Sequence, residues 1–142
     1  MNRRMIGATA FAIATSLAFA APACAEKMTM KLNLNAASEV PPNDSAGKGT
    51  ADVTYDSDSK VLTWKVTYSG LTGPATMAHF HAPAEAGKNA PPVVPFKDVS
   101  SGTEGTATLT DAQAADLMSG KMYVNVHTAA HPGGEIRAQV VK

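Results

Sequence analysis

The stretch TADVTYDSDSKVLTWKVTY, residues 50–68, contains the clearest strand pattern in the chain, because apolar and polar side chains alternate through both of its halves. The four residues between the halves, SDSK, have the composition of a tight turn. Period-two alternation on both sides of a short polar turn predicts a β-hairpin with one buried face. The residues predicted to face inward are Ala51, Val53, Tyr55, Leu62, Trp64, Val66 and Tyr68.

Similar short strands are predicted along the rest of the chain, separated by segments rich in proline and glycine. Seven or eight strands at regular intervals indicate an all-β fold, an antiparallel Greek-key β-sandwich or barrel. The segment 93–96 contains Pro95 and is therefore predicted as a brief edge strand. The further predicted strands are 28–35, 77–81, 105–110, 122–128 and 135–142.

One short helix is predicted near residues 111–118, inserted between two late strands. Thr110 and Gln113 have the spacing of a capping box, and Gly120 is a typical helix stop. Leu117 and Met118 are expected to pack inward.

The N-terminus has the pattern of a secretory signal peptide. Arg3 and Arg4 precede an apolar run over residues 5–21, and Ala23 and Ala25 fit a peptidase site before Glu26. We therefore predict a signal peptide over residues 1–25, a single domain over residues 26–142, and a periplasmic or secreted location. Lipidation of Cys24 is an alternative, which the alanines and proline preceding it disfavour.

Composition excludes several function classes for residues 26–142. This segment contains no cysteine, which excludes zinc-finger, thiol-redox and blue-copper chemistry. No cluster of lysine or arginine interrupts it, so we expect neither a nucleic-acid partner nor a polybasic membrane patch. We also expect no membrane span there.

His79 and His81, in MAHFHAPAE (residues 77–85), are the first candidate metal ligands. In a strand their side chains lie on one face, about 7 Å apart along the chain. Ala78 and Phe80 take the other face and are the natural core members. Both imidazoles are therefore expected to point away from the core, where they can converge on one ion.

His127 and His131 complete the predicted ligand set. His127 ends the strand YVNVH and shares a face with Tyr123 and Asn125, so its ring also points away from the core. If this strand ends near residues 77–81 in space, then His79, His81 and His127 form a three-imidazole site. His131, in the turn that follows, or a water would be the fourth ligand.

Four further residues are predicted to support the site or fix its loops. Met77 shares a face with the two histidines of its strand, and thioethers favour copper, although methionine is also a common gap-filler. Glu135 is a candidate acceptor for His127 or His131. Asn125 and Arg137 are the other two supporting candidates.

Three segments resemble the CHRD domain, the repeat named from chordin and found also as a single secreted domain in bacteria. They are ASEVPPNDSAGKGTADV, LTGPATMAHFHAPAEAGKNAPPVV and GKMYVNVHTAAHPGGEIRAQV, in the family's order. The resemblance spans nearly all of residues 26–142 and implies a role as part of an extracellular binding protein.

A more distant likeness is to the copper half of copper-zinc superoxide dismutases. The sandwich itself is expected to be superoxide-dismutase-like or immunoglobulin-like. This likeness implies that His79, His81 and His127 are copper ligands. The chain departs from that family because no zinc loop, bridging histidine or cysteine pair follows His81. Arg137 would attract anions by this likeness, whereas pairing with Glu135 is the structural alternative that we prefer.

These observations favour an exported metal-binding protein, a copper carrier or protective binder, with zinc as the other candidate ion. The first alternative is a metal-free module that binds a protein partner in the envelope or an extracellular polymer. The second is a copper-dependent oxidoreductase that acts on superoxide.

Overall fold

The hairpin predicted over residues 50–68 is present in the computed structural model, which describes residues 26–142. Strands β2 (Lys48–Asp56) and β3 (Val61–Ser69) pair antiparallel, and Val53 lies opposite Trp64. Ala51, Val53 and Leu62 are completely buried, as the alternation predicts. The predicted signal peptide, residues 1–25, lies outside the described residues.

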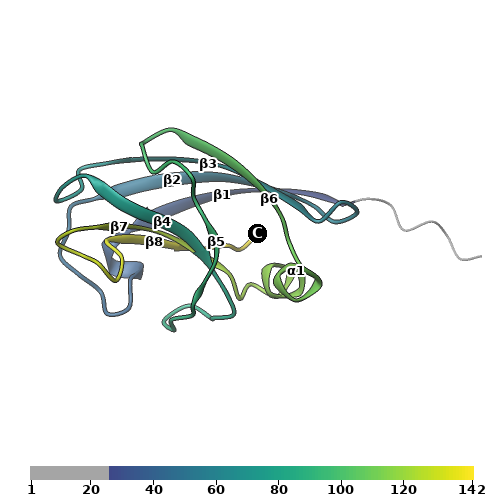
Figure 1. Ribbon diagram of the computed structural model, residues 1–142. Helices are drawn as coiled ribbons and strands as arrows, with labels where there is room; N and C mark the ends of the chain where they lie inside the picture. Colours follow the sequence, from purple (N-terminus) through teal and green to yellow (C-terminus); the bar gives the residue numbers. More distant parts are fainter. Residues whose placement is uncertain (1–25) are drawn as a thin grey trace, which may run out of the picture.

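Eight antiparallel strands form one nearly closed sheet, which confirms the predicted all-β fold. The sheet order is β5-β4-β7-β8-β1-β2-β3-β6. Figure 1 shows two layers, and only one residue pair, Asn35 with Arg137, joins β1 to β8. The other strands are β1 (Lys27–Asn35), β4 (Ala75–His81), β5 (Pro92–Pro95), β6 (Thr103–Thr108), β7 (Tyr123–Thr128) and β8 (Ile136–Gln139).

Most strand ends lie one or two residues from their predicted positions, and β6 and β8 differ most from the prediction. Strand β6 begins and ends two residues before the predicted segment 105–110. Strand β8 is shorter than the predicted segment 135–142, although Val140 remains buried and donates its backbone N–H to the carbonyl of Met122. Tertiary packing thus continues beyond the point where the sheet ladder ends.

The core fills the space between the layers, and an aromatic group lies near the two sheet edges. Trp64 stacks on Phe96 with ring centroids 4.9 Å apart and meets Phe80 edge-on at 5.2 Å. Phe80 comes from β4, so this group ties β3 to the strand that carries His79 and His81.

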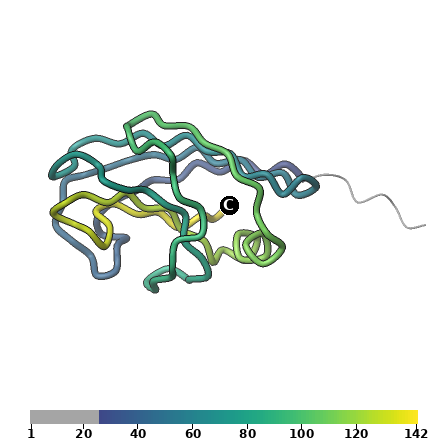
Figure 2. Tube along the Cα trace, viewed as in Figure 1, coloured from purple at the N-terminus to yellow at the C-terminus, as the bar shows by residue number. Residues whose placement is uncertain are grey.

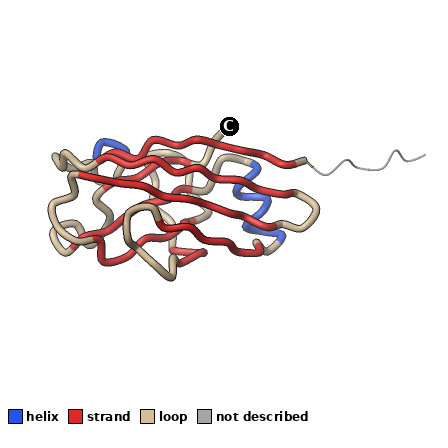
Figure 3. Tube along the Cα trace, turned by 90° about the horizontal axis from the view of Figure 1, so that it is seen from above, coloured by secondary structure: helices blue, strands red, loops and turns tan. Residues whose placement is uncertain are grey.

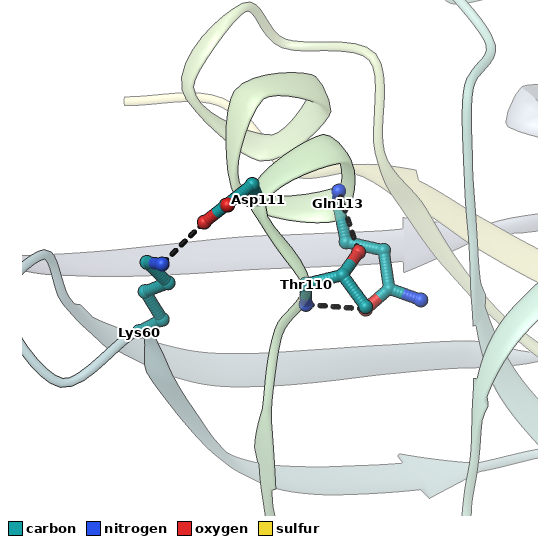
Figure 4. Close-up of polar contacts among 4 residues, drawn as sticks. All are labelled: Lys60, Thr110, Asp111 and Gln113. Atoms are coloured by element: carbon teal, nitrogen blue, oxygen red, sulfur yellow. Dashed lines mark hydrogen bonds and ion pairs between the residues drawn. The ribbon is translucent and has the colours of Figure 1, made fainter.

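Helix α1 (Asp111–Met118) begins with the predicted capping box. The Thr110 side chain accepts from the Gln113 backbone, and the Gln113 side chain accepts from the Thr110 backbone (Figure 4). Lys60 pairs with Asp111 in the first turn. Leu117 is buried, whereas Met118 is exposed, contrary to the prediction that both pack inward.

The helix lies at one end of the layers, far from the loops that follow β1 and β7. The short helix η1 (Ala36–Ser38) lies toward the opposite end (Figure 3). The loop after η1 and the turn over residues 129–134 lie at that end as well (Figure 2). Within residues 26–142, no helix is both long enough and apolar enough to cross a membrane.

Gly105 provides a test of the core packing. A Cβ atom at this position would lie 2.3 Å from the Trp64 ring, so Gly105→Ala should lower the free energy of unfolding by about 1–3 kcal/mol. Gly73→Ala is the matched control, because a Cβ there meets nothing within 4 Å. Urea denaturation followed by circular dichroism measures both variants, and equal stability of the two would contradict the packing.

Candidate metal centre

The candidate site lies on the face of β4 and β7 that points away from the core. Residues directly opposite one another on paired strands share a face, and side chains two apart on one strand do so too. The register therefore places six side chains on this face in three cross-strand pairs: Met77 with His127, His79 with Asn125, and His81 with Tyr123.

The opposite face of the same strands belongs to the core, as predicted from the alternation. Ala78, Phe80, Val124 and Val126 are all buried in the core cluster. The imidazoles are nevertheless not on an open surface, because His81 is 6% exposed and His127 is 5% exposed. Strand β7 is buried on both faces, so the outer face of the sheet is itself covered.

His79 and His127 approach each other directly. His79 Nδ1 lies 3.2 Å from His127 Nε2, and the rings are nearly perpendicular, with centroids 5.0 Å apart. His127 Nδ1 lies 2.9 Å from the backbone carbonyl of Pro132. Because a carbonyl only accepts, Nδ1 carries the hydrogen and Nε2 presents its lone pair toward His79.

His81 is held by hydrogen bonds at both ring nitrogens. Nδ1 lies 2.9 Å from the carbonyl of Ala90, and Nε2 lies 2.9 Å from Asn125 Oδ1. A neutral ring donates from one nitrogen only, so His81 can donate to only one of these two oxygens. The His81 ring also stacks on Tyr123, with centroids 4.6 Å apart and planes 3° from parallel.

The three imidazoles are close enough to share an ion. One nitrogen from each of His79, His81 and His127 lies within 4.8 Å of those of the others. Metal–nitrogen bonds of about 2.0–2.1 Å at a tetrahedral angle place two nitrogens about 3.3 Å apart. The 3.2 Å separation of His79 and His127 already matches this value, whereas His81 must exchange one hydrogen bond and move inward.

Burial keeps these rings in the neutral form that metal binding requires. Burial, followed by the nearby rings of His127 and His81, lowers the pKa of His79 to about 4. Burial is also the main cause that lowers the pKa of His81 and that of His127. Only the neutral ring has a lone pair to offer, so these rings do not have to lose a charge at neutral pH. The hydrogen that His79 Nδ1 directs at His127 Nε2 must nevertheless move to His79 Nε2 before Nδ1 binds an ion.

Two residues predicted for the site, the ligand His131 and the supporting residue Met77, lie at its margin. Among residues 26–142, the group with converging ligand atoms does not include His131, whose backbone N–H and carbonyl both bond to Thr128 in the turn. The turn presents the carbonyl of Pro132 to His127 instead. Met77 lies opposite His127 in the register and is 45% exposed.

Asn125 connects the site to Glu39, a buried residue. The Glu39 carboxyl is 3% exposed, burial raises its pKa to about 7, and its Oε1 has no hydrogen-bond partner among the described residues. Gly134 has a φ of +125°, and a Cβ there would lie 2.4 Å from Glu39 Oε1 and 2.6 Å from Asn125 Nδ2. A glycine is thus required for the turn to pack closely on both side chains.

Arg137 fixes the loop that covers His81. The guanidinium is 1% exposed, and its carbon lies 3.4 Å from the centroid of the Tyr123 ring. It donates to the Lys88 carbonyl at 2.8 Å and to Asn89 Oδ1 at 3.2 Å. The predicted pairing with Glu135 is wrong, because the guanidinium binds this loop instead.

Glu135 holds loops together and does not orient a histidine, contrary to the sequence-based suggestion. Its carboxylate accepts from Ser45 Oγ at 2.5 Å, Thr128 Oγ1 at 2.5 Å, and both the backbone and the hydroxyl of Thr72. Burial raises the pKa of this carboxyl, but these hydrogen bonds outweigh it and lower the pKa to about 2. The side chain is completely buried.

The sequence did not reveal which groups bind Nδ1 of His81 and Nδ1 of His127. Two of these are the backbone carbonyls of Ala90 and Pro132, and backbone atoms leave no signature in a sequence. The position of Tyr123 on the same face was predicted, because Tyr123 lies two residues before Asn125 and four before His127.

Comparison with protein families identifies the chain. The family model of the CHRD domain matches residues 30–140, and the chain therefore belongs to the CHRD domain family. This membership indicates an extracellular module. Searches of curated proteins and of solved structures found no match, so the likeness to superoxide dismutases stays a prediction.

Glu135→Gln tests the carboxylate that joins these loops. A carboxyl whose pKa falls from 4.5 to about 2 on folding stabilises the fold above pH 4.5 and loses that contribution as the pH falls toward 2. The variant should be less stable at pH 7 by on the order of 3 kcal/mol. Urea denaturation should show the two proteins converging as the pH approaches 2, and a pH-independent difference would contradict this origin.

Proposed function

We propose that this CHRD domain is an exported metal-binding protein that holds one copper ion through His79, His81 and His127. In this proposal it serves as a copper carrier or protective binder. The observation that carries it is the contact between His79 Nδ1 and His127 Nε2, which lie 3.2 Å apart.

The chemistry of the donor set supports a transition metal over calcium or magnesium. Imidazole nitrogen suits copper and zinc, whereas calcium and magnesium prefer oxygen ligands. The hydrogen bond from His127 Nδ1 to Pro132 is of the kind that orients metal-binding imidazoles, because it fixes the tautomer. His81 is oriented in the same way by Ala90.

The partial exposure of the site supports a carrier or binder. His79 is half-buried while His81 and His127 are buried, so an ion would be held at the edge of the protein with access from one side. Ions enter and leave such a site without unfolding of the domain. A role in the envelope is consistent with the extracellular character of the family and with the predicted signal peptide.

Removal of the paired imidazoles tests the proposal. Calorimetric titration should show one Zn(II) or Cu(II) bound per chain, and His79→Gln combined with His127→Gln should abolish this binding. His131→Gln is the matched control and should keep the wild-type affinity, because His131 lies outside the converging group. If the double variant does not fold, the half-buried His79→Gln alone should weaken binding at least 100-fold.

Thermal denaturation separates this proposal from a metal-free interaction module. An ion that binds only the folded state at 100 times its Kd adds about 2.7 kcal/mol to the free energy of unfolding and raises Tm. Wild-type protein should therefore melt at a higher temperature with Zn(II) or Cu(II), and the double variant should not. Unchanged melting of the wild type would favour the interaction module.

A further inference from the structure

Met77 is an exposed thioether beside the paired imidazoles. It is 45% exposed and is not part of the core cluster, so its side chain does not fill a gap in the interior. Its position is fixed by the ladder between β4 and β7, where it lies directly opposite His127. Directly opposed residues have Cβ atoms about 4.5–5.5 Å apart, within reach of a common ion.

The register also places Met77 next to His79. The two residues are separated by one position on β4, so both side chains project from the same face. The pairing with β7 is regular from Met77 to His81, and the irregularity in the ladder lies before Met77. Met77 therefore adjoins both of the imidazoles whose nitrogens approach to 3.2 Å.

His81, in contrast, is less free to bind an ion than its two neighbours. Both of its ring nitrogens already have partners at 2.9 Å, and its ring is stacked on Tyr123. An ion that needs only three ligands binds more readily to His79, His127 and a third side chain that has no hydrogen bond to give up. A thioether is a soft ligand that suits Cu(I) and is a poor ligand for Zn(II).

We infer that Met77 is a ligand for Cu(I) in this site, where its sulfur joins His79 and His127. This inference rests on the proposed function, because it requires that the two imidazoles bind metal. It assigns Cu(I) a ligand set that Zn(II) does not share, so the two ions should respond differently to loss of the sulfur.

Met77→Leu tests the inference, because leucine keeps the apolar volume and removes the sulfur. Cu(I) affinity is measured by competition with a chromogenic Cu(I) chelator under ascorbate, and Zn(II) affinity by calorimetry. We expect Met77→Leu to weaken Cu(I) binding at least tenfold and to change Zn(II) binding less than twofold. Met118→Leu is the matched control, since Met118 is 48% exposed on α1, and it should change neither.

The outcomes distinguish this inference from the proposed function. Wild-type protein that binds neither ion contradicts the proposed function itself. Wild-type protein that binds Cu(I) as tightly as Met77→Leu overturns the role of Met77 alone. Equal weakening of Cu(I) and Zn(II) in the variant also overturns it, because that result indicates a packing role. X-ray absorption of the Cu(I) form should show a sulfur neighbour that is lost in Met77→Leu.

Discussion

The antiparallel register between β4 and β7 is the constraint on which the site depends. It places His79 opposite Asn125 and Met77 opposite His127, while Phe80 and Val124 meet on the core face. A slip of one residue would exchange the faces, burying the imidazoles beside Trp64 and exposing Phe80. Because Phe80 is completely buried and packs edge-on against Trp64, the core determines the register and the register determines the site.

The loops around this face form an outer layer that contacts the histidines. Pro132 and Ala90 supply the carbonyls that fix the His127 and His81 rings. Arg137 holds the loop that contains Ala90, through Lys88 and Asn89, and Glu135 joins β7 and β8 to the loops before β2 and after β3. None of these supporting groups has to contact the ion. They restrict the positions that the imidazoles can adopt, which lowers the cost of bringing them together.

Much of the fold and the face of the site could be predicted from the sequence, because both follow from period-two alternation. The alternation in 50–68 predicted the hairpin, and that around Phe80 predicted which side His79 and His81 take. The prediction that His127 lies close to His79 and His81 depended on β4 and β7 being neighbours. This long-range pairing is not specified by any local pattern. His131 could not be placed, because the hydrogen bonds of its turn determine which group faces His127.

The supporting residues were harder to predict than the ligands. Glu135 and Arg137 are only two positions apart, which suggested that they pair, yet each binds loops distant in sequence. Glu39 is buried with one oxygen unpartnered among the described residues, and nothing in the EVPP segment indicates this. Side chains that tie loops together depend on how the strands are ordered, and that order emerges only from the whole fold.

Anomalous diffraction from crystals grown with Zn(II) or Cu(II) tests whether His79 and His127 converge on one ion. One anomalous peak is expected between His79 Nδ1 and His127 Nε2, about 2 Å from each, with His127 Nδ1 still bonded to Pro132. Crystals that show no peak at this position, with the two imidazoles still in direct contact at saturating metal, would contradict it.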